Sequence, residues 1–203
     1  MKPNGNELVL ASGNQGKLRE FGQLLAQWQI NVRPQSDWQV SDADEIGLTF
    51  IENAILKARH AAEATGLPAL ADDSGIEIDA LHGAPGIYSA RYSGTHGDNA
   101  GHIRQVLQEL DGVPDAKRTC RFVCVLALMR HANDPRPLIC QGLWEGRVLH
   151  APAGEGGFGY DPIFFVPEQQ CSAAELPSEV KNRLSHRALA SQQLRHALPA
   201  WLG

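Results

Sequence analysis

Residues 8–28 read LVLASGNQGKLREFGQLLAQW, and this stretch predicts a strand, a tight loop and a helix in succession. Residues 8–11 form a short apolar run, which is typical of a buried strand. Residues 12–16 are small or polar and include two glycines, so they are expected to end the strand. The apolar residues that follow recur every three or four positions, which predicts one buried helix face. They are Leu18, Phe21, Leu24, Leu25 and Trp28.

The same alternation of strands and helices continues to the end of the chain. Thr49 and Glu52 have the spacing of a capping box, so a helix is expected to begin there and to stop at Gly66. Further helices are expected after Asp98, from Glu179 and beyond His186. Strands are expected at residues 69–71, 76–78, 121–129, 138–144 and 163–166. This alternation favours an α/β or mixed-sheet fold, and because no linker divides the chain we expect one domain over residues 1–203 with two lobes.

The composition indicates an ordinary globular protein without a basic excess. Hydrophobic residues make up 43% of the 203 residues, charged residues make up 20%, and the formal net charge is −5. Proteins that wrap a nucleic-acid backbone are normally basic, so no nucleic-acid polymer is expected as a partner. If the substrate is a polyanion, the positive charge that binds it must be concentrated in one place.

Cysteine usage and hydrophobic runs bear on the location of the protein. The four cysteines form no C-x-x-C pair, no histidine cluster has zinc spacing, and we expect buried, reduced thiols. Residues 1–7 lack the apolar core of a signal peptide, and the longest apolar run, residues 122–129, is too short to span a bilayer. We therefore expect a cytoplasmic protein with no membrane partner.

The first candidate binding site lies between the first expected strand and helix. Its residues are Ser12, Gly13, Asn14, Gln15, Gly16 and Lys17. A glycine turn at this place exposes backbone N–H groups beside a helix N-terminus, and both attract phosphate. A P-loop would need glycine in place of Ala11 and serine or threonine in place of Leu18, so this is a different loop. The alternative is a plain turn followed by a solvated lysine.

Two adjacent acids, Asp72 and Asp73, follow the expected strand at residues 69–71. Neighbouring side chains of a strand point to opposite faces, so the two acids are expected to do different jobs. Mg²⁺ favours one or two carboxylates together with water and substrate phosphates, and Glu45 is the candidate for a second carboxylate. The alternative is a polar turn after a strand.

Glycines surround Phe158 in residues 154–159. The segment formally contains G-x-G-x-x-G, but an apolar strand follows it, so we reject a dinucleotide-binding interpretation. An aromatic ring on a glycine-rich loop suits stacking on a base, which contributes ~1–3 kcal/mol in single-strand binding sites. The alternative is a core phenylalanine next to a turn.

The segment 181–187 places several hydrogen-bond donors near the start of an expected helix. Its lysine, arginine and histidine side chains suit contacts with the polar edge of a ligand. The alternative is a solvated basic face.

Taken together, these segments resemble the noncanonical purine nucleoside-triphosphate pyrophosphatases, the inosine-triphosphatase family. The resemblance covers nearly the whole chain, in the order of the family's motifs, at residues 12–17, 49–54, 71–75, 83–92, 156–161 and 185–187. It implies a hydrolase that uses Mg²⁺ to cleave ITP, dITP, XTP and dXTP to the nucleoside monophosphate and pyrophosphate, which cleanses the nucleotide pool. It also implies an elongated α/β mixed-sheet fold, with two lobes flanking a central active-site cleft, and a homodimer.

The resemblance also implies a role for each matching residue. Residues 12–17 resemble the triphosphate-binding loop. Glu45 and Asp73 resemble the magnesium ligands, and Asp73 also resembles the catalytic proton acceptor for the attacking water. Ser74 is expected to contact the substrate, and Lys57 is a further candidate phosphate contact. The residues expected to recognise the nucleoside are Phe158, Gly159, Tyr160, Asp161, Lys181, His186 and Arg187.

Two other functions use part of the same sequence features. A related pyrophosphatase for modified pyrimidine or methylated nucleotides shares the lysine loop and the acids but should lack the set at residues 185–187. A nucleotide sensor would bind the same ligand without releasing pyrophosphate. Hydrolysis of a panel of nucleotides separates both from the first interpretation.

Overall fold

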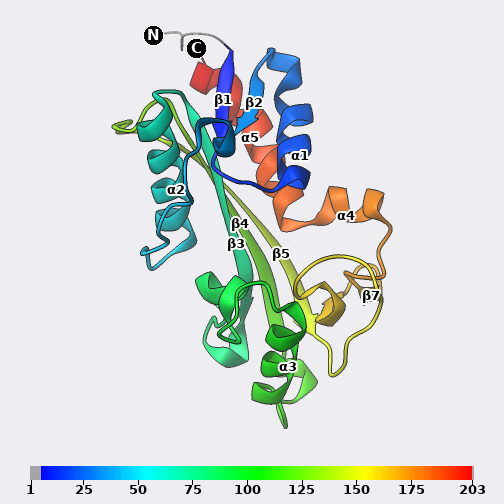
Figure 1. Ribbon diagram of the computed structural model, residues 1–203. Coiled ribbons are helices and arrows are strands. Elements are labelled where there is room, and N and C mark those ends of the chain that lie inside the picture. Colours follow the sequence, from blue (N-terminus) through cyan, green and yellow to red (C-terminus); the bar gives the residue numbers. More distant parts are fainter. Residues whose placement is uncertain (1–5, 203) are drawn as a thin grey trace. The chain divides into compact units, whose positions relative to one another are not determined.

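The computed structural model describes residues 6–202 and has an α/β architecture (Figure 1). The strands are β1 (Glu7–Leu10), β2 (Asn31–Pro34), β3 (Ala69–Ile78), β4 (Thr119–Met129), β5 (Leu138–Val148), β6 (Phe164–Val166) and β7 (Cys171–Ser172). The helices are α1 (Gln15–Leu25), α2 (Phe50–Thr65), α3 (Asn99–Glu109), α4 (Ser178–Leu184) and α5 (His186–Leu202). None of the helices within residues 6–202 has the length and hydrophobicity that a membrane span requires.

The strands form one mixed sheet in the order β2-β1-β3-β4-β5-β6-β7. β1 is parallel to both β2 and β3, whereas β6 is antiparallel to both β5 and β7. The register pairs Val9 with Ala69 and Leu10 with Leu70, so β1 ends beside the first residues of β3. The mixed sheet confirms the α/β fold class that the sequence predicts.

The chain divides into two compact units. Among the described residues, the first consists of residues 6–73, 125–141 and 190–202, and the second consists of Ser74–Cys124 and Gly142–Leu189. β3, β4 and β5 each begin in one unit and end in the other. The single domain over residues 1–203 and the cleft flanked by its lobes stay predictions.

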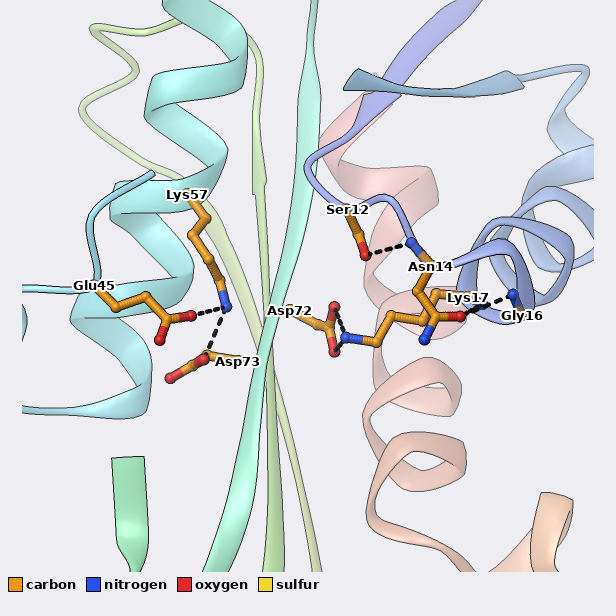
Figure 2. Close-up of polar contacts among 8 residues, drawn as sticks. All are labelled: Ser12, Asn14, Gly16, Lys17, Glu45, Lys57, Asp72 and Asp73. Carbon is orange, nitrogen blue, oxygen red and sulfur yellow. Dashed lines mark hydrogen bonds and ion pairs between the residues drawn. The ribbon is translucent and has the colours of Figure 1, made fainter. Parts of the chain in front are cut away.

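In the first unit, α1 and α2 lie on opposite sides of β3 (Figures 1 and 2). α1 buries Phe21, Leu24 and Leu25, which are members of the apolar face that the sequence predicts. α2 begins as expected, because the Thr49 side chain accepts a hydrogen bond from the Glu52 amide at 3.1 Å. Such a cap satisfies one of the amides that the first turn of a helix leaves unpaired.

The second unit has an aromatic centre to its core. The rings of Phe122 and Phe164 are 4.4 Å apart between centroids, and those of Trp144 and Phe164 are 4.9 Å apart. Beside this core, the buried guanidinium of Arg118 donates to the carbonyls of Leu110, Val148 and Leu149. Arg118 therefore ties the end of α3 to the end of β5, which compensates for its burial.

The structure corrects the sequence prediction at the two adjacent acids. Residues 69–71 and 76–78, expected as separate strands, form the single strand β3, so residues 72–75 lie within a strand and not after one. Adjacent acids are typical of solvated turns, which is why the sequence predicts a turn here. In the structure both carboxylates are instead paired with lysines, and this pairing allows them to lie in a buried strand. The prediction also missed β2, which contains Pro34 and lies at the edge of the sheet, where proline is tolerated.

The tight contact of β5 with β6 gives the first testable prediction. A Cβ at Gly146 would lie 2.5 Å from the Phe164 ring and 2.7 Å from the Phe165 carbonyl oxygen. We expect Gly146→Ala to lower the free energy of unfolding by about 1–3 kcal/mol, because the backbone or the ring must move. Urea unfolding followed by circular dichroism measures the change.

Gly22 on α1 provides the matched control, since a Cβ there meets nothing within 4 Å. Gly22→Ala should raise the free energy of unfolding by about 0.4–1 kcal/mol, because alanine restricts the unfolded chain. Equal stability of the two variants would contradict the packing described for β5.

Candidate active site

The loop between β1 and α1 satisfies several of its own amides. The Asn14 side-chain oxygen accepts from the amides of Gly16 at 2.8 Å and Lys17 at 3.1 Å, and the Ser12 hydroxyl accepts from the Asn14 amide at 3.1 Å. The loop therefore has the helix N-terminus that the sequence predicts. Its amides are partly occupied by side-chain oxygens, which a phosphate oxygen would have to replace or join.

Lys17 lies against a buried carboxylate. Its Nζ is 2.8 Å from each of the two carboxylate oxygens of Asp72, whose side chain is only 1% exposed (Figure 2). This pair joins α1 to β3 across 55 residues of sequence. The alternative of a solvated lysine is wrong, because Asp72 sets the direction of the ammonium group.

Asp73 points to the other side of β3, toward α2 (Figure 2). There the Lys57 Nζ donates to Asp73 Oδ1 at 2.8 Å and to Glu45 Oε1 at 2.9 Å. The two adjacent acids thus have different partners, as expected for neighbours in a strand. Glu45 and Asp73, the two expected magnesium ligands, share one cation.

Charge and burial make this side of the strand unusual. Burial raises the pKa of Asp73, and although Lys57 opposes this effect, the nearby charges of Glu45 and Asp72 reinforce it. Burial alone would lower the pKa of Lys57, but attraction to Asp73, then to Asp72 and Glu45, raises it above its ordinary value. Lys57 is therefore a permanent cation, while Asp73 is a carboxylate with increased proton affinity.

One carboxylate oxygen in the group lacks a donor. Asp73 Oδ2 is buried and accepts no hydrogen bond from any residue between 6 and 202. A buried acceptor of this kind costs free energy unless a ligand completes it. Together with the shared position of Glu45, this oxygen fits a hard divalent cation such as Mg²⁺.

The expected nucleoside-recognition residues and Ser74 lie in the second unit. Phe158 is 78% exposed, so the alternative of a core phenylalanine is wrong and its ring is accessible for stacking. Tyr160, by contrast, is buried, and its hydroxyl donates to the Ser89 carbonyl at 2.8 Å. The Tyr160 side chain supports the loop from the core, which leaves only its backbone for contact with a nucleotide.

Asp161 organises the loop around Phe158. Its buried Oδ2 accepts from the Phe158 amide and from the Lys181 ammonium group. Lys181, on α4, is therefore directed by Asp161 and is not simply part of a solvated basic face. The same bonds restrict Asp161 as an acceptor for a base, a use that the sequence leaves open.

His186 and Arg187 form the first turn of α5. The ring of His186 stacks on Phe122 with 4.8 Å between centroids, and the Ser185 hydroxyl accepts from the Ala188 amide at the start of the helix. The histidine is thus held by the aromatic core of the second unit. The phosphate and metal candidates lie in the first unit, so binding of one nucleotide by both sets remains a prediction.

The sequence matches a family over almost its whole length. The family model described as the Ham1 family matches residues 8–197. The chain belongs to the Ham1 family. The match includes all the residues that the sequence singles out for the phosphates, the metal and the nucleoside.

Close relatives of this Ham1-family chain carry a functional name. A Vibrio cholerae protein named dITP/XTP pyrophosphatase is 56% identical over 192 residues, which are 95% of this chain and 96% of that protein. A Vibrio parahaemolyticus protein with the same name is 57% identical over 194 residues, 96% of this chain and 97% of that protein. The solved structure of a HAM1 protein from Coxiella burnetii matches with a TM-score of 0.92 at 52% identity, covering 96% of this chain and 98% of that one.

The relatives and the fold confirm the family predicted by the resemblance. The pairing of Lys17 with Asp72, and of Lys57 with both Glu45 and Asp73, is new information from the structure. Sequence reasoning missed Asp72 as the partner of Lys17, because no local pattern connects residues so far apart in the chain.

The charge balance around Asp73 gives the second prediction. The folded-state pKa of Asp73 is raised, so its ionisation removes stability as the pH rises through that pKa. Lys57→Met removes the only cation that the structure pairs with Asp73 within residues 6–202, which enlarges the effect. We expect a loss of about 3 kcal/mol in the free energy of unfolding at pH 8, shrinking as the pH falls toward 4.

The exposed Lys117 is the control, since Lys117→Met removes the same charge from the surface. Its effect on stability should be small at every pH. Urea unfolding at pH 5 and pH 8 makes the comparison. A Lys57→Met deficit that does not change with pH would show that Asp73 is not under electrostatic strain.

Proposed function

We propose that this protein hydrolyses noncanonical purine nucleoside triphosphates, dITP and ITP together with XTP and dXTP, to the nucleoside monophosphate and pyrophosphate. The observation that carries the proposal is the arrangement at β3, where two lysines and the carboxylate of Glu45 gather around the adjacent acids Asp72 and Asp73. The family and the names of its close relatives support the choice of substrate. Removal of deaminated purines from the nucleotide pool follows as the biological role.

The triphosphate would lie along the part of β3 that β1 leaves uncovered. β1 ends opposite Leu70, two residues before Asp72. Lys17 is on one side of this strand and Lys57 is on the other (Figure 2). Two ammonium groups and the helix N-terminus at residues 14–17 supply the positive charge that a polyphosphate needs.

Glu45 and Asp73 are the residues that would hold Mg²⁺. The metal ion, when bound, would neutralise negative charge on the substrate phosphates. Carboxylate oxygens suit this ion, and two of them leave room for phosphate oxygens to complete its coordination. The buried Oδ2 of Asp73 is the oxygen best suited to a ligand.

Asp73 would also accept the proton of the attacking water. Lys57 holds Oδ1 and so fixes the orientation of the carboxylate. Burial raises the pKa of Asp73, which increases its strength as a base. Water would attack at the α–β phosphate linkage, and Lys17 with Lys57 would stabilise the departing pyrophosphate.

Recognition of the base would use the second unit. The exposed ring of Phe158 offers a stacking surface, and Lys181, His186 and Arg187 offer donors for O6 of a 6-oxo purine. Adenine presents a donor at this position, so the same groups would be left unpaired. Mismatches of this kind reject a wrong base by up to about 10⁴-fold.

We further propose a cytoplasmic homodimer. The four cysteines, all among the described residues, form no disulfide, and free thiols are typical of proteins of reducing compartments. Ile46 and Leu48 are 78% and 81% exposed, and such side chains favour a covering partner. Sedimentation at micromolar concentration that gave only the mass of one chain would contradict the dimer.

Replacement of the proposed base tests the activity directly. Asp73→Asn keeps the shape of the side chain but removes the base and one of the negative charges that would bind Mg²⁺. We expect turnover of dITP to fall by at least ~100-fold, since general base catalysis alone contributes that much. Pyrophosphate release in the presence of Mg²⁺ is the measurement.

Wild-type protein and a substrate panel complete the test. The panel contains ITP, dITP, XTP, ATP, GTP and 5-methyl-UTP, and both pyrophosphate and orthophosphate are measured. Preference for the modified pyrimidine would favour the related pyrophosphatase. Orthophosphate as the first product, or normal turnover by a folded Asp73→Asn protein, would refute the mechanism.

The stacking role of Phe158 gives another prediction. Phe158→Ala should raise KM for dITP by about 5- to 150-fold, because base–aromatic stacking contributes ~1–3 kcal/mol. Phe158→Trp should keep KM close to that of the wild type. Since Phe158 is exposed, neither change should alter the unfolding midpoint, and an unchanged KM for the alanine variant would remove the ring from the site.

A further inference from the structure

The segment that carries Glu45 is neither a strand nor a helix. Residues 40–49 precede α2 and lie outside the regular elements of the structure. A carboxylate on such a segment is placed precisely enough for metal binding only if side chains anchor the backbone near it. The anchors nearest to Glu45 in the chain come from the first turn of α2, while Gln35 and His60 bind the earlier residues Asp42 and Ser41.

Two side chains in the first turn of α2, those of Glu52 and Asn53, bind this segment. The Asn53 side-chain oxygen accepts from the Gly47 amide at 2.9 Å, and Glu52 Oε2 accepts from the Leu48 amide at 2.9 Å. Glu52 also accepts from the Thr49 hydroxyl at 3.0 Å. The bonds of Thr49 and Glu52 belong to the helix cap, whereas the bond of Asn53 reaches further back, to two residues from Glu45.

The contact between Asn53 and Gly47 is close. A Cβ at Gly47 would lie 2.7 Å from the Asn53 side-chain oxygen and 2.7 Å from Glu52 Cβ. The backbone at Gly47 therefore lies directly on the helix turn, where only glycine fits without a shift.

The burial of Asn53 does not favour stability. It is fully buried, and its Nδ2 donates to no acceptor in the part of the chain from residue 6 to residue 202. A buried donor without an acceptor lowers stability. Asn53 also lies four residues before Lys57, and residues at this spacing share one face of a helix. The face of α2 that binds Gly47 is therefore the face whose lysine binds Glu45 and Asp73.

We propose that Asn53 is a positioning residue for Glu45, and that its bond to the Gly47 amide sets the affinity of the protein for Mg²⁺. The proposal rests on the function proposed above, in which Glu45 is a magnesium ligand. Asn53 does not touch the substrate; it acts by holding the backbone that presents the carboxylate.

The test is Asn53→Leu, which keeps the branched shape of the side chain but removes the acceptor for the Gly47 amide. Loss of a partner that orients a metal ligand typically weakens metal binding by 10–100-fold, so we expect the Mg²⁺ concentration for half-maximal dITP hydrolysis to rise by about that factor. At saturating Mg²⁺, kcat should stay within about twofold of the wild type, since the acid–base groups are unchanged. Binding of Mn²⁺ in the presence of α,β-imido-dITP, read from the electron paramagnetic resonance signal of the unbound ion, should weaken in parallel.

Two variants separate positioning from general damage to the helix. Asn53→Asp keeps an acceptor for the Gly47 amide, so the Mg²⁺ concentration for half-maximal dITP hydrolysis should be no higher than that of the wild type. Ala62→Gly destabilises α2 at its far end and should leave the Mg²⁺ requirement unchanged.

Several results would overturn the proposal. One is an Asn53→Leu protein whose half-maximal Mg²⁺ concentration is unchanged. The others are an Asn53→Asp or an Ala62→Gly protein in which Mg²⁺ binding is weakened as much as in Asn53→Leu. Failure of the proposed function gives a different result, because the wild-type protein itself would then show no Mg²⁺-dependent release of pyrophosphate.

Discussion

The first unit of this protein depends on the pairing of two adjacent buried acids with two lysines from different helices. Asp72 and Asp73 point to opposite sides of β3, where Lys17 of α1 and Lys57 of α2 meet them. A buried carboxylate without a counter-charge is strongly destabilising. Each acid therefore specifies which helix face must lie beside its side of the strand, so the same two ion pairs organise both the fold and the candidate site.

The two pairs differ in a way that suits a division of labour. Both oxygens of Asp72 bind Lys17, which makes Asp72 a guide for that lysine. Asp73 binds Lys57 through one oxygen, while the other is buried without a donor among the described residues 6–202. Charge repulsion from Glu45 and Asp72 adds to the effect of burial on Asp73. One acid is satisfied by the protein, and the other retains capacity for a ligand.

In the second unit, too, a buried carboxylate fixes a lysine of the candidate site. A single buried carboxylate oxygen of Asp161 accepts hydrogen bonds from the Phe158 backbone amide and from the ammonium group of Lys181. An exposed ring and a directed cation are thereby held by one core residue. The buried Tyr160 supports the same loop from below, which explains why an aromatic residue beside Phe158 belongs to the core and not to the surface.

The sequence by itself determined the local elements and the chemical groups, because these depend on near neighbours in the chain. The strand–loop–helix opening, the caps at Thr49 and Asp98, and the presence of the acids, the lysines and a phenylalanine among glycines are all readable from residue type and spacing. Only the tertiary structure decided that residues 72–75 continue a strand, that Lys17 binds Asp72, and that Asn53 anchors the segment of Glu45. These contacts follow from the order of strands in the sheet and from the placement of helices on its two sides, which bring distant residues together and leave no local signal in the sequence.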